Sequence, residues 1–346
     1  MRILLLILSV FVVTFKSHTQ GLFPFREGEL WGYMDTLGNR VIEPVYPMAG
    51  FFTEGLAYAQ IGDALGFINM SGEVTIEPAY AAATNFHNGF ASVMVDEDWM
   101  VIDKNGDFTM ETYFAKPMVF NNGLAKFKLE MGLRSKYGFV NIYGDTVIYP
   151  QYEFVSDFSE GLCMATLDGS TYGYIDINGE WVVEPSFSLG VLMKMNDEYD
   201  FSDKNFKGGY VAIEKEEKYG LMNRNGEIVI PCQFDFLGQF GEGLIPARKD
   251  DKYGYINLEG KWIIQPIYSS AELFQNGLAA VSTGPMFESK YGFINAKGEV
   301  VIPLEIASYF SMYESMRFWE GFVPCYIEPG VFGYLNRKGK VIWKTE

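Results

Sequence analysis

The sequence predicts an all-β repeat protein made of nine tandem three-stranded antiparallel meanders. Three features predict it: a glycine recurring at a near-constant interval, an aromatic-glycine-aromatic strand in almost every interval, and an Asp or Asn followed three residues later by Gly. Successive recurring glycines, the anchors, differ by 34, 34, 34, 38, 48, 34, 34 and 44 positions, a spacing typical of stacked repeats. The anchors are Gly21, Gly55, Gly89, Gly123, Gly161, Gly209, Gly243, Gly277 and Gly321.

Residues 1–20 have the pattern of a secretory signal peptide: Arg2, an apolar run over 3–15, and a polar stretch up to Gln20. The alternative is an N-terminal membrane anchor, although this run is shorter than the roughly 20 residues that a spanning helix needs. We expect an exported protein, periplasmic, cell-surface or secreted, whose mature part is not membrane-embedded. The expected repeats are 21–54, 55–88, 89–122, 123–160, 161–208, 209–242, 243–276, 277–320 and 321–346.

Each repeat begins with a strand directly after its anchor. The second and fourth residues after the anchor are apolar in all nine repeats, which is the two-residue period of a strand with one face in a core. A second strand follows with the pattern of Tyr253-Gly254-Tyr255, and only Met100 replaces the central glycine. Because glycine inside a strand usually marks a close approach, we expect an aromatic ring of the adjoining repeat to lie over it.

A tight turn and a third strand complete the repeat, as in 257–266. Asn257 and Gly260 fit a type I turn, in which the first residue caps the backbone and the fourth adopts positive φ. An apolar strand then runs to a proline such as Pro266. A linker with a phenylalanine three residues before the next anchor (Phe52, Phe86, Phe120, Phe158, Phe240, Phe274) should fill the space between repeats.

The recurring hairpin, as in Lys252-Tyr-Gly-Tyr-Ile-Asn with its later glycine and proline, closely resembles the WG (KWG) repeats of bacterial proteins. The resemblance covers essentially all of residues 21–346. It implies an exported or cell-associated β-repeat protein that binds or scaffolds, and it brings no agreed reaction and no catalytic residues. The departures are Met100, Thr112 in place of the proline in the third repeat, and two longer linkers.

The repeats could stack as an open, curved solenoid or superhelix, or close into a propeller-like ring. We favour the open form for three reasons. Nine repeats exceed the usual four to eight propeller blades, and each repeat has three predicted strands where a blade has four. The chain also begins on a first strand and ends after a third strand, so no terminal repeat is completed by splicing the two ends.

Composition limits the possible partners. The net charge of −17 argues against nucleic acid and anionic membrane surfaces. The three cysteines are too few for a disulfide-stapled protein, and we expect Cys163 and Cys325 to be small buried hydrophobes. We therefore expect a protein or cell-envelope partner, with a glycan as a further possibility because aromatic residues are abundant.

The sequence contains no recognisable catalytic set and no cofactor motif. His87, the one histidine beyond residue 20, has no nucleophile motif beside it, so we interpret it as an ordinary linker residue. Asp35, Asp103 and Asp176 should form turns. Glu43, Glu77 and Glu184 precede prolines, so they should be structural as well. The acidic segment around Asp200 lacks the loop spacing of a calcium site. We assign no catalytic, cofactor or metal residue, and no binding residue can be named.

The two long linkers, 186–208 and 304–320, are the least repetitive segments and are either binding insertions or solvated loops. The leading hypothesis for function is a non-enzymatic scaffold that binds a protein or an envelope component. Two alternatives are a glycan-binding lectin and a carbohydrate-active enzyme that uses two carboxylates. The lectin requires solvent-facing aromatic residues, and the enzyme requires two acidic residues close together in a concavity.

Overall fold

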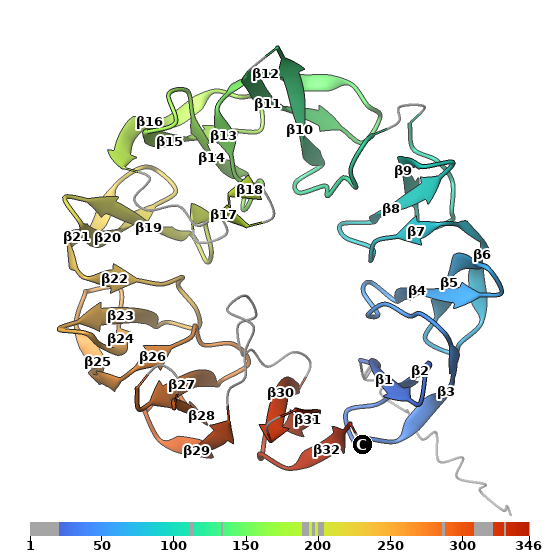
Figure 1. Ribbon diagram of the computed structural model, residues 1–346. Coiled ribbons are helices and arrows are strands. Elements are labelled where there is room, and N and C mark those ends of the chain that lie inside the picture. Colours follow the sequence, from blue (N-terminus) through green and yellow to red (C-terminus); the bar gives the residue numbers. More distant parts are fainter. Residues whose placement is uncertain are drawn as a thin grey trace, which may run out of the picture.

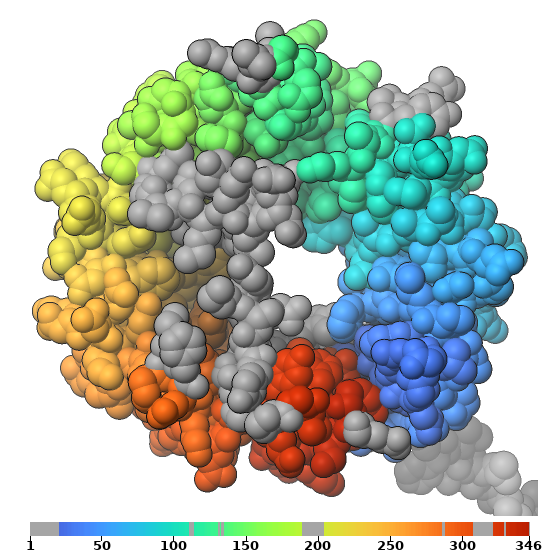
Figure 2. Space-filling model, in the orientation of Figure 1, coloured from blue at the N-terminus to red at the C-terminus, as the bar shows by residue number. Residues whose placement is uncertain are grey.

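The computed structural model shows β-sheet modules arranged around a central opening (Figures 1 and 2). It describes residues 21–110, 114–132, 134–188, 194–195, 198–199, 204–285, 288–307, 321–328 and 330–345. The secondary-structure elements of this part of the chain are all β-strands, and none of the residues described lies in an α-helix. The expected all-β repeat fold is therefore confirmed.

Three kinds of strand recur in each module. The first strands, which follow the anchors, are β1 (Phe23–Glu27), β4 (Leu56–Ile61), β8 (Phe90–Val95), β10 (Leu124–Met131), β14 (Leu162–Thr166), β19 (Tyr210–Lys215), β23 (Ile245–Lys249), β27 (Ala279–Thr283) and β30 (Phe322–Glu328). The second strands are β2 (Leu30–Met34), β5 (Ala64–Asn69), β9 (Asp98–Asp103), β11 (Arg134–Asn141), β15 (Thr171–Asp176), β20 (Lys218–Asn223), β24 (Lys252–Ile256), β28 (Lys290–Ile294) and β31 (Val331–Asn336). The third strands are β3 (Arg40–Tyr46), β6 (Val74–Tyr80), β12 (Thr146–Tyr152), β16 (Trp181–Ser188), β21 (Ile228–Phe234), β25 (Trp262–Tyr268), β29 (Val300–Ala307) and β32 (Val341–Lys344).

The described strands form nine small antiparallel sheets of three or four strands, one for each module, and none of these sheets closes on itself. A two-stranded ribbon, β17 (Lys194–Met195) with β18 (Glu198–Tyr199), is separate from them. In several modules the preceding linker contributes a short outer strand that pairs with the first strand. These linker strands are β7 (Ala82–Ala83), β13 (Phe154–Val155), β22 (Phe236–Leu237) and β26 (Ser270–Ala271).

The third module departs from this plan, as its sequence suggested. No third strand is assigned among its described residues, and isolated bridges pair Ile102 with Phe108 and Trp99 with Phe114. Met100, in the place of the usual glycine, is buried. Thr112, the other departure, lies outside the described residues.

The central glycine of the second strand lies under the backbone of the third strand of its own module. A Cβ atom on Gly173 would lie 2.2 Å from the Val183 carbonyl oxygen and 2.8 Å from the Pro185 nitrogen. The strand register shifts at the same point. Tyr172 pairs with Phe187 and Tyr174 pairs with Val183, so an advance of two residues on the second strand corresponds to four on the third. The expected aromatic ring over this glycine was therefore wrong: the bulge before the proline is what excludes a side chain.

The Asp/Asn-to-Gly turns are confirmed. In the second module the Asn69 side-chain oxygen accepts hydrogen bonds from the backbone N–H groups of Ser71 and Glu73, at 2.9 and 3.1 Å. Gly72 donates its N–H to the Asn69 carbonyl and has φ +80°, which favours glycine. This turn joins the second strand to the third with a defined register.

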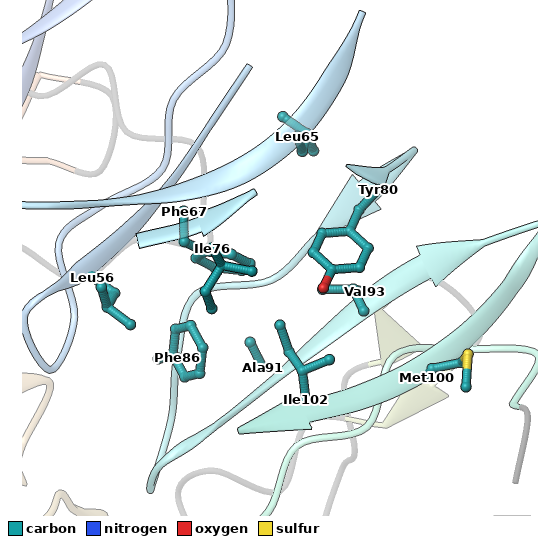
Figure 3. Packing of buried hydrophobic residues seen from close by; sticks show 10 residues of the cluster. All are labelled: Leu56, Leu65, Phe67, Ile76, Tyr80, Phe86, Ala91, Val93, Met100 and Ile102. Carbon is teal, nitrogen blue, oxygen red and sulfur yellow. The ribbon is translucent and has the colours of Figure 1, made fainter. Parts of the chain in front are cut away.

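The cores lie between modules. Each of the nine buried apolar clusters among the described residues combines side chains of two modules, so neither module completes its core alone. Figure 3 shows one of them, in which Phe86 of the linker lies between side chains of the second and third modules. Phe86 is 1% exposed, and its ring centre lies 4.9 Å from that of Phe67. The predicted role of the linker phenylalanines is thus confirmed.

The first and last modules also share a core. Phe23, Phe25 and Met34 of the first module pack with Phe322 and Tyr334 of the last, and all five are buried. The Tyr334 hydroxyl donates a hydrogen bond to the Pro24 carbonyl at 3.0 Å. In Figure 1 β1 and β32 lie side by side accordingly.

The array of modules is therefore a closed ring, which was the alternative to the favoured open solenoid, and that preference is corrected. The sheets themselves are open, as expected. We had favoured the open form because each module was predicted to have three strands. We had also expected the first and last modules to stay apart, because neither is completed by a strand from the other end of the chain. The linker strands raise some modules to four strands. Side-chain packing and the Tyr334–Pro24 hydrogen bond, rather than strand pairing, join the end modules, because each otherwise exposes an apolar face.

Candidate binding surface

A groove separates the third strands of the fifth and sixth modules, β16 and β21. It has a volume of about 570 Å³, within the usual range for ligand sites. We call it the β16–β21 groove. Its lining residues are Val183, Glu184, Ser186, Phe187, Ile213, Lys215, Glu216, Gly226, Ile228, Pro231 and Cys232.

The packing between modules leaves this groove open. Val183 packs against the fifth-to-sixth core, and its Cγ2 atom would lie 3.0 Å from a Cβ on Gly226 of the next module. The two third strands belong to different sheets, so no backbone pairing closes the space between them. Their sides that face away from the core, including Glu184 and Ile228, remain exposed.

The groove combines apolar walls with a charged rim. Val183, which is half-buried, and Ile228, which is 49% exposed, supply aliphatic surface, whereas Ile213 also lines the groove but is fully buried. Glu184, Lys215 and Glu216 are exposed at the rim, and none of the ion pairs found in the described part of the chain involves them. The groove can therefore accept an apolar side chain beside a charged one.

Cys232 is the partly exposed cysteine, and it lines the groove. Burial raises the pKa of its thiol, an effect that the nearby Lys215 partly offsets. Cys163 and Cys325 are buried as predicted, and desolvation raises the pKa of Cys325 to about 12 and that of Cys163 still further. None of the three thiols has the lowered pKa of a reactive nucleophile.

A maleimide reagent is therefore expected to label the folded protein once, at Cys232, and faster as the pH rises above 8 because the thiolate fraction then increases. Peptide mapping by mass spectrometry after a short exposure identifies the labelled residue. Replacing Cys232 with serine should abolish the rapid label, and unfolding in denaturant should expose all three thiols. Rapid labelling of Cys163 in the native protein would contradict the burial described.

Exposed apolar residues recur on the third strands around the ring. Most are β-branched, and Ile267 and Val300 are examples at 60% and 53% exposure. We call this set the third-strand surface. Its members are Val41, Val45, Val74, Val147, Tyr149, Val182, Ile228, Val229, Ile263, Ile267, Val300, Val301 and Val341.

The other residues singled out from the sequence lie in separate linkers and turns where the structure describes them. His87 lies in a linker, where its Nε2 atom is 2.8 Å from the Asn121 side-chain oxygen. Asp35 and Asp176 cap their turns as predicted. Asp103 does the same by accepting hydrogen bonds from the Asn105 and Asp107 N–H groups. The described residues contain no cluster of three or more metal-ligating side chains, and Asp200 lies outside them.

Sequence reasoning singled out Glu184 only as a structural residue before a proline, and the structure also places it in the lining of the groove. Nothing in its own repeat distinguishes it from Glu43 and Glu77. The neighbouring module gives one signal: Cys232 occupies the place that proline holds in most repeats. Much of 186–208 and most of 304–320, the long linkers, lie outside the described residues.

Among the described residues, the carboxyl groups whose pKa is displaced have a lowered pKa. Backbone N–H groups of Thr171 and Ser170 hold the pKa of Asp168 well below its usual range, and hydrogen bonds from lysine side chains lower those of Asp235 and Glu259. At Asp35, Glu54 and Asp176, desolvation raises the pKa but several hydrogen bonds outweigh it. A general acid in a glycosidase needs the opposite shift.

The repeat aromatic residues mostly face the cores. The second aromatic of each hairpin, such as Tyr33, Phe139 or Tyr255, is at most 3% exposed. Tyr143 and Tyr149 of the fourth module are the large exceptions, at 70% and 76% exposure. They lie at the turn and on β12, outside the aromatic-glycine-aromatic positions.

These features define a class of protein: a β-repeat array whose modules complete one another's cores. A model of the family described as "WG containing repeat" matches residues 31–63, 66–99, 137–169, 172–188, 219–253, 253–284 and 291–316, more than half of the chain. The chain belongs to this WG-repeat family. No helix in the part described is long and apolar enough to cross a membrane.

Among solved structures, BamB from Moraxella catarrhalis is similar at 10% identity and a TM-score of 0.41, covering 85% of this chain and 94% of that one. AztD from Citrobacter koseri is 10% identical with a TM-score of 0.43, and the similarity covers 94% of each chain. Kluyveromyces lactis Hsv2p is 8% identical with a TM-score of 0.36, covering 70% of this chain and 90% of that one. No curated protein matches the sequence.

Proposed function

We propose that this WG-repeat protein is an exported, non-enzymatic scaffold that binds a protein or cell-envelope partner through its third-strand surface. The observation that supports binding is the recurrence of exposed β-branched residues on adjacent third strands, such as Ile263 and Ile267 on β25 and Val300 on β29. Large exposed apolar patches on soluble proteins usually mark interaction sites.

Export is supported by the sequence of residues 1–20, which lie outside the described residues. The non-enzymatic role is supported by the sequence, in which we find no recognisable catalytic set. A glycan partner is the second candidate, and the exposed rings of Tyr143 and Tyr149 favour it.

Partner capture from native cell-envelope extract tests the proposal. Replacing Ile263 and Ile267 with serine should reduce retention of the same partner about tenfold, because apolar contact area is lost. The control replaces Leu37 and Leu167, which are exposed but lie on turns rather than third strands. Capture of the partner that survives the β25 changes and fails with the control would contradict the proposal. Binding to a glycan array that is lost only in the Tyr149→Ala variant would favour the second candidate.

A further inference from the structure

We propose that the β16–β21 groove binds a basic, extended peptide segment of the partner, with its apolar side chains on the aliphatic walls and its lysine or arginine side chains beside Glu184 and Glu216. This inference rests on the proposed function and specifies the chemistry of one contact. It follows from the composition, charge and geometry of the groove.

The charges of the groove favour a cation. Its rim carries two carboxylates, Glu184 and Glu216, against one ammonium group, Lys215. None of the three takes part in an ion pair found in the described part of the molecule, so a ligand can pair with them without breaking one. The net charge of −17 would also draw a basic segment toward the ring and repel an acidic one.

The walls favour a peptide over a sugar or a metal ion. The accessible wall residues Val183 and Ile228 are aliphatic, whereas sugar sites usually offer flat aromatic faces. The one aromatic lining residue, Phe187, is only 9% exposed. Among the described residues there is no group of three metal-ligating side chains at the groove or elsewhere.

The two walls favour an extended segment held by its side chains. Both walls are edge strands, but Pro185 and Pro231 each lack an N–H group at the middle of the wall. Backbone pairing along either edge is therefore interrupted. A strand-like segment presents side chains alternately to opposite sides, so one set can face the walls while the other set stays in solvent.

A control for the site exists in the chain itself. Glu77 and Asp96 occupy the same repeat positions in the second and third modules as Glu184 and Glu216 do in the fifth and sixth, and both are exposed. The third module carries Val95 and Phe108 at the repeat places of Lys215 and Ile228, and its described residues opposite β9 pair with that strand through isolated bridges. The two acidic pairs therefore have the same charge but different surroundings.

The test uses the full chain and a fluorescent synthetic peptide that alternates lysine with valine, measured by anisotropy at physiological ionic strength. The variant with Glu184→Gln and Glu216→Gln should bind this peptide about tenfold more weakly. The variant with Glu77→Gln and Asp96→Asn, which removes the same net charge, should bind it within about twofold of the unchanged protein. Modification of Cys232 with N-ethylmaleimide should also weaken binding, because the adduct occupies the groove.

Two comparison peptides check the chemistry, one with glutamate and one with serine in place of lysine. Three outcomes would each overturn the proposal. Both double variants could weaken binding equally, the glutamate or serine peptide could bind as tightly as the lysine peptide, or the Cys232 adduct could have no effect on binding. Circular dichroism melting curves should be unchanged, because all four acidic residues are exposed. If the lysine peptide fails while the β25 serine variant still loses its native partner, the groove proposal fails and the scaffold function stands.

Discussion

Replacing Gly173 with alanine is expected to destabilise the fifth module by about 3 kcal/mol or more. The new Cβ atom would lie 2.2 Å from the Val183 carbonyl oxygen and 2.8 Å from the Glu184 carbonyl carbon. Both are backbone atoms of β16, so the bulge that places Pro185 must move, and the contact with the sixth module moves with it. Urea unfolding followed by tryptophan fluorescence measures the loss, and hydrogen exchange locates it.

Gly55→Ala is the matched control. A Cβ atom there meets nothing within 4 Å, but the backbone has φ +88°, so only conformational strain of about 1 kcal/mol is expected. Gly173 itself does not have positive φ, which separates the steric effect from backbone strain. A Gly173→Ala protein as stable as the control would show that the third strand does not press on the second.

Phe52→Ala is expected to cost about 3–5 kcal/mol, the usual range for a buried phenylalanine. The Phe52 side chain is 6% exposed, and its ring centre lies 4.6 Å from that of Tyr33. It fills the core between the first two modules together with Ile42 and Ile68, so its removal leaves a cavity at that interface. Thermal unfolding should begin at a lower temperature in this variant.

The adjacent residue supplies the control, because Phe51 is 43% exposed. Phe51→Ala removes the same side chain from the same linker and should cost less than about 1 kcal/mol. Equal losses from the two substitutions would mean that the linker phenylalanines are not the packing element between modules. Hydrogen exchange should show added opening of the first two modules for Phe52→Ala.

The sequence predicted those features that residues close in the chain determine. The turn from Asn69 to Gly72 depends on a side-chain cap and one positive φ, and both requirements are visible in the residue types. The burial of Phe86 follows from its fixed distance to the next anchor. Local chemistry of this kind repeats with the sequence, so comparing repeats was enough to find it.

Features that depend on distant backbone were not predictable in the same way. The glycine at position 173 is the only residue type that signals the bulge of Glu184 and Pro185 over it. A glycine alone does not show what approaches it, so we wrongly expected an aromatic ring there. Closure of the array depends on a small rotation between modules that accumulates around the ring, and no single repeat specifies it. The β16–β21 groove likewise exists only where two modules meet.

A disulfide across the first and last modules tests the central claim most directly. A Cβ atom on Gly38 would lie 3.8 Å from the Cβ of Ile342, which is close to the mean separation in disulfides. Gly38→Cys with Ile342→Cys, in a Cys232→Ser background, should therefore form an intramolecular cross-link on mild oxidation. Gly28→Cys with Ile342→Cys is the control, because Gly28 also has positive φ but has no atoms within 4 Å of its Cβ position.

The closed ring predicts that mass spectrometry of the oxidised monomer finds a peptide joining positions 38 and 342, and that the control pair yields none. An open array would keep the two ends apart, so the engineered pair would form only intermolecular dimers. That outcome would contradict the claim that every module, including the first and the last, covers the apolar face of its neighbour.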